Sequence, residues 1–264
     1  MRAWPIALTI LFAAPASAED LRDLCADRPG LGTPPCTVDS GHVMVETGLV
    51  DWTRERDAAT TTDTVLAGDT LVRLGIADHA EVRIGWTPFG HVREKDRASG
   101  AVTSTSRVGD VTLALVRNLA NPDGSGVSIA VLPFATLPVG RMPVGAGDWG
   151  AGVIVPASFD LGGGVALALS PEVDAAVDGD GEGRHLAYGS VIGLEAELND
   201  RLSAAIELSA FRDRDPEGHA TEALGALSIA WQPGENLQFD AGANVGLNHA
   251  SADVELYVGI SRRF

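Results

Sequence analysis

Residues 237–248, LQFDAGANVGLN, carry the clearest fold signal in the chain. Their odd-numbered positions hold Leu, Phe, Ala, Ala, Val and Leu, and their even-numbered positions hold Gln, Asp, Gly, Asn, Gly and Asn. Because successive side chains of a β-strand point to opposite faces, this alternation predicts a strand with one apolar and one polar face. The last segment of the chain, residues 253–261, repeats the pattern.

The same period of two recurs from His42 to the end of the chain and is broken by turn residues. We count twelve such segments, among them a hairpin over residues 70–86 and a strand over residues 188–198. Helical patterns are nearly absent. The sequence therefore predicts an all-β fold over residues 41–264.

Loop lengths indicate how the apolar faces are used. A soluble sandwich buries its apolar face, whereas an outer-membrane barrel turns that face to lipid. Connections after the even-numbered segments are tight, as at residues 77–80 and 199–200, and those after odd-numbered segments are mostly longer and polar, notably residues 93–106 and 213–218. This alternation is typical of a transmembrane antiparallel up-and-down β-barrel, here of about 12 strands, with short periplasmic turns. A soluble periplasmic β protein remains an alternative.

Aromatic residues support the barrel. Interfacial rings are enriched where strands enter and leave the hydrocarbon. The sequence places Trp52, Trp149 and Phe211 at outer strand ends, and Phe159, Trp231 and Phe264 at periplasmic ends. An aromatic residue that closes an amphipathic strand is similar to the signal read by outer-membrane assembly machinery. We expect Tyr257 and Phe264 to carry that membrane-insertion signal.

The N-terminus indicates export. Arg2, the apolar residues 6–14 and the small residues 16–18 form a signal peptide over residues 1–18. We therefore expect the protein in the outer membrane of a Gram-negative bacterium. Residues 19–40 are predicted to be a periplasmic segment in which Cys25 and Cys36 form a disulfide, because both cysteines lie in a short Pro/Gly-rich stretch that reaches an oxidising compartment. Whether this segment folds into a pore is left open.

Charge limits the partners. The chain has 36 acidic and 19 basic residues, a formal net charge of −17, and no basic cluster. Phosphate-backbone recognition needs a basic face, so nucleic acid is not expected as a partner. The expected partners are outer-membrane lipids, the assembly machinery and a small-molecule solute.

The polar strand faces give the residues that we expect to line the lumen. They are Glu46, Arg73, Glu81, Arg83, Asp110, Glu195, Glu197, Glu207, Asp240, Asp253 and Glu255. Rings of carboxylates in a pore favour cations. The alternative is that these charges pair with one another and fill the interior, because a 12-stranded barrel lies between the filled 8-stranded and the open 16-stranded types.

Other kinds of site find little support. An enzyme would need a nucleophile, a base and an orienting group that converge in space, and the Asn, His and Ser of residues 248–251 are too close together along the chain to form such a relay. Asp178, Asp180 and Glu182 resemble part of a calcium loop but lack its full spacing, so a solvated acidic loop is expected there. We predict no catalytic residue, cofactor or metal site.

Four short motifs add a family resemblance. They are VETG at residues 45–48, LVRLG at 71–75 followed by Asp78 and the EVR of 81–83, VGDV at 108–111, and LPVG at 137–140. In this order the chain resembles the outer-membrane β-barrel proteins grouped as transporters of the MetA pathway of phenol degradation. Val139 departs from the small polar residue expected in that family.

The resemblance implies a channel for passive uptake of small molecules, often aromatic or otherwise hydrophobic. Family membership alone does not fix the solute. The alternative is a structural or surface-interaction outer-membrane barrel without an open pore. Its outer loops are modest in length, which gives little room for a recognition surface.

Overall fold

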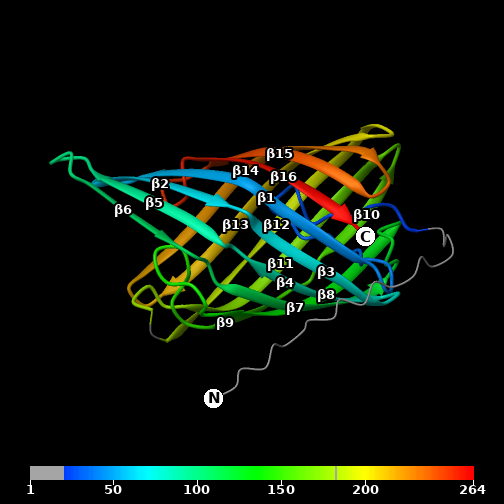
Figure 1. Cartoon of the computed structure of the whole chain (residues 1–264), viewed down its shortest axis with the longest axis horizontal. Coiled ribbons are helices and arrows are strands. Elements are labelled where there is room, and N and C mark those ends of the chain that lie inside the picture. Colours follow the sequence, from blue (N-terminus) through cyan, green and yellow to red (C-terminus); the bar gives the residue numbers. More distant parts are fainter. Residues whose placement is uncertain (1–20, 182) are drawn as a thin grey trace, which may run out of the picture.

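The computed structural model describes residues 21–181 and 183–264, so the predicted signal peptide lies outside the described residues. Within this part of the chain, β-segments form one antiparallel sheet that closes on itself (Figure 1). The segments are β1 (Val43–Arg56), β2 (Thr60–Ala67), β3 (Asp69–Ala77), β4 (Ala80–Trp86), β5 (Phe89–Asp96), β6 (Val102–Arg107), β7 (Val111–Ala120), β8 (Val127–Leu137), β9 (Gly150–Ile154), β10 (Ala157–Gly162), β11 (Val165–Val177), β12 (Arg184–Asn199), β13 (Leu202–Asp215), β14 (Gly218–Gly234), β15 (Leu237–Gly246) and β16 (Val254–Arg263). No helix among the described residues is long and apolar enough to cross a membrane.

These segments make up a closed barrel of 12 strands, because four strands are each interrupted once. The interruptions separate β2 from β3 at Gly68, β4 from β5 at residues 87–88, β6 from β7 at residues 108–110, and β9 from β10 at residues 155–156. Gly68 has a φ of 73°, a left-handed conformation that suits glycine. The barrel closes where β1 pairs with β16. The predicted fold class and strand number are confirmed.

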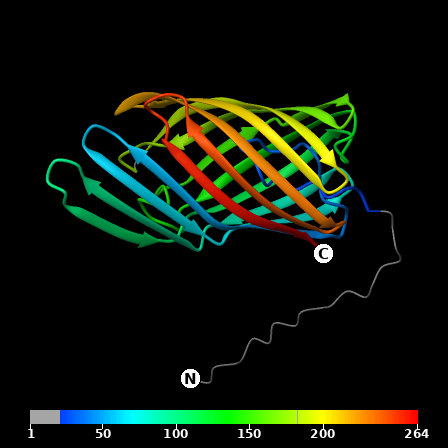
Figure 2. The same ribbon diagram turned by 90° about the horizontal axis from the view of Figure 1, so that it is seen from above.

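One part of the sheet projects beyond the rest. Figure 2 shows β2, β5 and β6 extending from one end of the barrel, and β6 pairs with β5 and with no other strand of the described residues. The prediction of a long loop over residues 93–106 is wrong, since β5 and β6 occupy most of it and leave a turn at residues 97–101. Likewise, β13 and β14 occupy most of residues 213–218. Both faces of these extensions are polar, so they lack the alternation that reveals a strand.

The apolar faces of the strands point outward. Phe239 and Val245 of β15 are exposed, whereas Asp240 and Asn244 of the same strand are buried. Exposed large apolar side chains recur along most of the other strands, up to 63% for Leu227. Monomeric soluble proteins rarely expose apolar patches of this extent, so this surface matches a lipid-facing belt.

Aromatic side chains occupy both ends of this belt, with one correction. Trp231 and Phe239 stack with ring centroids 5.7 Å apart near the end that holds the C-terminus, and Trp149 is exposed near the other. Phe211 was expected at the lipid interface, but it shares the inward face of β13 with Glu207 and packs against Gly189. The alternation continues to the end of β13, so Phe211 points to the same face as Glu207, four positions earlier.

Candidate functional site

The interior of the barrel is occupied by the chain's own N-terminal segment, residues 21–42, which we call the plug. Figure 2 shows it in blue inside the barrel wall. Side chains from β1, β4, β7, β11, β13 and β15 bind its backbone. The plug therefore packs onto the inner wall and does not form a unit apart from the barrel.

Carboxylates of the wall hold the plug backbone. Glu46 of β1 accepts hydrogen bonds from the backbone N–H groups of residues 27 and 28 at 3.0 and 2.9 Å. Glu81 of β4 accepts one from Val38 at 2.7 Å. Hydrogen bonds between an N–H group and an ionised carboxylate are stronger than neutral ones, and they satisfy plug N–H groups that no sheet pairs.

Glu207 of β13 binds a turn of the plug. Its two carboxylate oxygens accept hydrogen bonds from the N–H groups of Leu31 at 2.8 Å and Gly32 at 3.0 Å. Gly30 has a φ of 126°, and a Cβ there would lie 2.8 Å from Glu207 Oε2. Glycine at position 30 thus permits both the backbone conformation and the close approach of the carboxylate.

Arg73 of β3 joins the wall to the two cysteines. Its side chain is fully buried and forms ion pairs with Glu46 at 3.0 Å and Glu81 at 2.8 Å. It also donates hydrogen bonds to the carbonyl oxygens of Cys25 at 2.8 Å and Cys36 at 3.3 Å. The predicted disulfide between Cys25 and Cys36 is confirmed. The disulfide therefore holds the backbone at Cys25 and at Cys36 against the guanidinium of Arg73.

Further ion pairs join plug and wall. Arg83 of β4 contacts Asp27 at 2.7 Å, and Arg28 contacts Asp240 of β15 at 3.0 Å. Of the eleven residues expected to line the lumen, six are therefore buried around the plug: Glu46, Arg73, Glu81, Arg83, Glu207 and Asp240. Within this region the charges pair, as the alternative reading of a filled interior anticipates.

The other five expected lumen residues lie elsewhere. Asp110, between β6 and β7, accepts hydrogen bonds from Gly140 and Ala146 of the 138–149 loop at 2.8 and 2.7 Å. Glu255 accepts one from Asn244 at 2.9 Å. Glu195 and Glu197 are exposed on β12. The last of the five, Asp253, precedes β16. Asp253 lies at the outer rim, where it pairs with the exposed Arg56, 3.0 Å away.

The two residues of the expected membrane-insertion signal lie on opposite faces of the last strand. Tyr257 is buried in the lumen, where the Arg28 guanidinium lies 5.5 Å from its ring centroid. Phe264 is exposed, and its backbone exchanges hydrogen bonds with Val43. In the folded barrel Tyr257 therefore contacts the plug, and a role for either residue in assembly remains a prediction.

Sequence reasoning missed the plug's partners on the wall. Asn118 donates a hydrogen bond to the Pro35 carbonyl at 2.9 Å, and Gln238 donates one to the Arg28 carbonyl at 2.7 Å. Ser170 exchanges hydrogen bonds with the backbone of Thr33. The only signal in the sequence is that these polar residues lie on inward strand faces, which does not say what they bind.

Two adjoining cavities remain between the plug and the wall of β3, β4 and β7. The larger, about 340 Å³, is lined mainly by polar and charged groups, including Arg28, Glu46 and Asp110. The smaller, about 190 Å³, is mostly apolar, with Leu132 and Phe134 of β8 in its lining. Both cavities are bordered by Asp27, Leu71, Gly85 and Thr112. A polar space thus lies beside an apolar one along a single wall.

The loop of residues 138–149 is tied to β12, which lies two strands along the wall from β9. Asp148 forms an ion pair with Arg184 of β12 at 2.9 Å, and that guanidinium also lies 4.0 Å from the ring centroid of Trp149. The hydrogen bond from the Trp149 backbone N–H and the contact with Arg184 hold the pKa of Asp148 below its ordinary value. Asp148 is therefore ionised at neutral pH.

Solved structures share this fold. An outer membrane channel from Pseudomonas putida F1 aligns with a TM-score of 0.68 at 14% identity, over 95% of this chain and 100% of that one. The NanC porin aligns with a TM-score of 0.52 at 8% identity, over 83% of this chain and 98% of the porin. The translocator domain of the autotransporter NalP from Neisseria meningitidis gives 0.54 at 10% identity, over 85% and 89%. At identities this low, the alignments establish the barrel fold alone. The function has to be argued from the site.

The comparison with curated proteins gave no match. The protein family described as "Putative MetA-pathway of phenol degradation" matches residues 26–264, in agreement with the motifs around Glu46, Arg73 and Asp110. The match spans the plug from Ala26 as well as the whole barrel. The chain therefore belongs to this family.

Proposed function

We propose that the protein is an outer-membrane channel for the passive uptake of small molecules, with aromatic compounds among its solutes. The observation that carries this proposal is the pair of adjoining cavities, one polar and one apolar, along the wall of β3, β4 and β7. A solute with an apolar ring and a polar end matches this pair of cavities, because the ring can lie in the apolar cavity while the polar end lies in the polar one.

The sizes of the cavities support aromatic solutes. A cavity of about 150 Å³ lined by apolar side chains is large enough to bind benzene. The apolar cavity, about 190 Å³, therefore accommodates one aromatic ring against Leu132, Phe134 and Ile154. The polar cavity, about 340 Å³, has room for a ring with its substituent.

The inner surface favours cations over anions. Acidic side chains outnumber basic ones among the residues expected to line the lumen, and the basic ones, Arg73 and Arg83, are already paired with carboxylates. Exposed Glu195 adds a negative charge that no ion pair among the described residues neutralises. Carboxylates without such partners attract mobile cations into a pore.

A permanently charged aromatic cation tests solute class and charge together. Benzyltrimethylammonium carries a ring and a positive charge and crosses lipid poorly, and tetramethylammonium lacks the ring. We expect wild-type protein in a planar bilayer to conduct both ions. Gly85→Leu should lower benzyltrimethylammonium permeability, measured from the reversal potential against K⁺, because Gly85 borders both cavities.

Gly225→Leu is the matched control. A Cβ at Gly85 would meet its nearest neighbour at 3.7 Å, and one at Gly225 would meet its nearest at 3.6 Å, so both sites accept a side chain. Gly225 lies among the outward residues Leu208, Val245 and Leu247, away from the cavities. Equal permeability in both variants would remove the cavities from the solute path.

The second candidate function is a structural or surface-interaction barrel without an open pore. The plug's many bonds to the wall favour it, since they fill the region around Arg73. The planar bilayer separates the two functions. A protein with a full β-sheet circular dichroism signal that never conducts supports the closed barrel and contradicts the channel.

The same proposal includes the expected surroundings of the protein. Residues 1–18 direct export, the plug enters the lumen from the periplasmic end, and the outward belt contacts outer-membrane lipids. Tyr257 and Phe264 supply the signal for the assembly machinery. We assign no catalytic step to the chain.

A further inference from the structure

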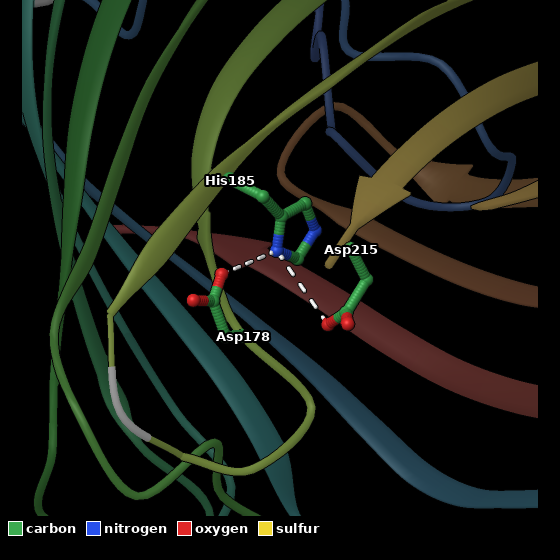
Figure 3. Close-up of side chains that lie close together, drawn as sticks. All are labelled: Asp178, His185 and Asp215. Carbon is green, nitrogen blue, oxygen red and sulfur yellow. Dashed lines mark hydrogen bonds and ion pairs between the residues drawn. The ribbon is translucent and has the colours of Figure 1, made fainter. Parts of the chain in front are cut away.

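Four side chains gather at the outer rim of the barrel, away from the plug. Asp178 begins the loop between β11 and β12, His185 lies near the start of β12, and Asp213 and Asp215 end β13 (Figure 3 shows three of them). Because β12 and β13 are neighbours and the loop folds back toward them, residues far apart in the sequence meet here.

The imidazole of His185 is the centre of the group. Its side chain is only 5% exposed. Its Nδ1 atom lies 2.9 Å from Asp178 Oδ1 and 3.6 Å from Asp215 Oδ2. One atom from each of these three side chains lies within 4.8 Å of the other two. Figure 3 shows both carboxylates directed at the same ring nitrogen.

The other ring nitrogen faces a third carboxylate. His185 Nε2 lies 2.7 Å from Asp213 Oδ1, but the angle does not make a hydrogen bond, and Nε2 has no other partner among the described residues. A carboxylate beside one ring nitrogen favours the proton on that nitrogen. Nδ1 donates a hydrogen bond to Asp178 when it carries the proton, and with the proton on Nε2 it offers a lone pair on the side of Asp178 and Asp215. Two carboxylates and a ring lone pair this close repel one another, and a cation between them removes that repulsion.

The neighbouring arginine does not supply that charge. Arg184, adjacent in sequence, is engaged with Asp148 at 2.9 Å and with the Trp149 ring. Backbone N–H groups add partial charges only: those of Gly179 and Glu217 donate hydrogen bonds to Asp215 at 2.5 and 2.7 Å, and that of Asp215 donates one to Asp213 at 2.8 Å. Three carboxylates therefore surround one imidazole, and even a fully protonated ring leaves a net negative charge.

We propose that Asp178, His185 and Asp215 bind a divalent first-row transition cation of the zinc class, with Asp213 orienting the imidazole. Imidazole and carboxylate ligands suit zinc, whereas calcium and magnesium prefer oxygen alone. Ligand atoms of a tetrahedral zinc site lie about 3.3 Å apart, given bonds of about 2.0–2.1 Å. The separations of 2.9 and 3.6 Å at His185 Nδ1 bracket that value.

The site has the form that such centres take in proteins. A ligating histidine commonly directs its second nitrogen at a carboxylate, which fixes the ring and raises its basicity. Here Asp213 takes that position through the 2.7 Å charge contact with His185 Nε2. The three ligands come from a loop and two strands, so a bound cation fastens the loop that begins at Asp178 to the rim of the barrel.

The test uses the full mature chain without an affinity tag, refolded in detergent, with Zn²⁺ and Co²⁺ as probes and Ca²⁺ for comparison. Isothermal titration should give one equivalent of Zn²⁺ for wild type. His185→Asn and Asp215→Asn should lose this binding, and Asp213→Asn should weaken it by about 10- to 100-fold. Co²⁺ should give visible absorption bands of a nitrogen-containing four-coordinate site.

His249→Asn is the matched control, since His249 lies in the exposed 247–253 loop. Zn²⁺ binding that survives in His249→Asn and disappears in His185→Asn supports the site. Unchanged binding in His185→Asn, equal affinity for Ca²⁺, or no binding by wild type overturns it and leaves a protonated histidine as the cation. Should His185→Asn fail to fold, Asp215→Asn supplies the same comparison.

Discussion

Replacing Glu207 with Gln tests whether the plug closes the lumen. Glu207 accepts hydrogen bonds from two plug N–H groups, Leu31 at 2.8 Å and Gly32 at 3.0 Å. Gln has the same shape, but one of its two terminal atoms is an NH₂ group that cannot accept. One plug N–H therefore loses its acceptor and faces another donor, while the backbone and the cavity volume stay the same.

The size of the effect follows from that single bond. A hydrogen bond to a charged group contributes about 1.5–3 kcal/mol, and each 1.4 kcal/mol changes an equilibrium about tenfold. If the plug leaves the wall when the channel opens, Glu207→Gln should raise the ratio of open to closed states by about 10- to 100-fold. The change is in occupancy, so the conductance of a single open channel should stay the same.

Single-channel recording in a planar bilayer measures the open fraction, and hydrogen exchange of residues 27–34 reports plug release independently. Glu195→Gln is the matched control, because Glu195 lies on the neighbouring strand and the same face without a hydrogen bond to the plug among the described contacts. Open fraction and exchange that equal wild type in a folded Glu207→Gln protein would refute the reasoning that the plug gates the pore.

Three further perturbations follow from the site. Cys25→Ser with Cys36→Ser removes a bridge between residues 11 apart in sequence, which should cost about 3 kcal/mol of plug stability and speed its hydrogen exchange, whereas the barrel's circular dichroism stays unchanged. Arg73→Met leaves two buried carboxylates without their shared cation and should lower the free energy of unfolding by about 3–5 kcal/mol, measured by urea titration in detergent. A midpoint equal to wild type would mean that these acids are protonated. Glu195→Gln with Glu197→Gln should shift the reversal potential in a KCl gradient toward zero, because it removes two exposed carboxylates from β12. An unchanged potential would place cation selectivity elsewhere.

Much of the barrel could be predicted because its signals are local. The alternation at residues 237–248 reflects an apolar environment on one face of the strand and a polar one on the other. β15 orients these faces as expected, with Phe239 outward and Asp240 inward. The pattern weakens where both faces meet water. The polar extensions of β5 and β6 were therefore expected to be a loop.

The candidate site was predicted only in its parts. An inward face for Glu207 follows from periodicity, but its pairing with Leu31 and Gly32 spans more than 170 residues of sequence, and no local pattern encodes it. The same holds for His185, which meets Asp215 only because β12 and β13 are paired in a particular register. Phe211 shows the same limit, since it was expected at the lipid interface and faces inward.

The sequence by itself determined that the strands are amphipathic, that their apolar faces meet lipid, and that Cys25 and Cys36 can pair. These properties depend on residues close together in the chain and on the solvent each face meets. Only the tertiary structure decided that the lumen holds the plug and that Arg73 lies between Glu46, Glu81 and the disulfide loop. Closing the barrel brings distant strands around one interior, and buried charges must then find partners there, because an unpaired charge away from water is too costly to keep.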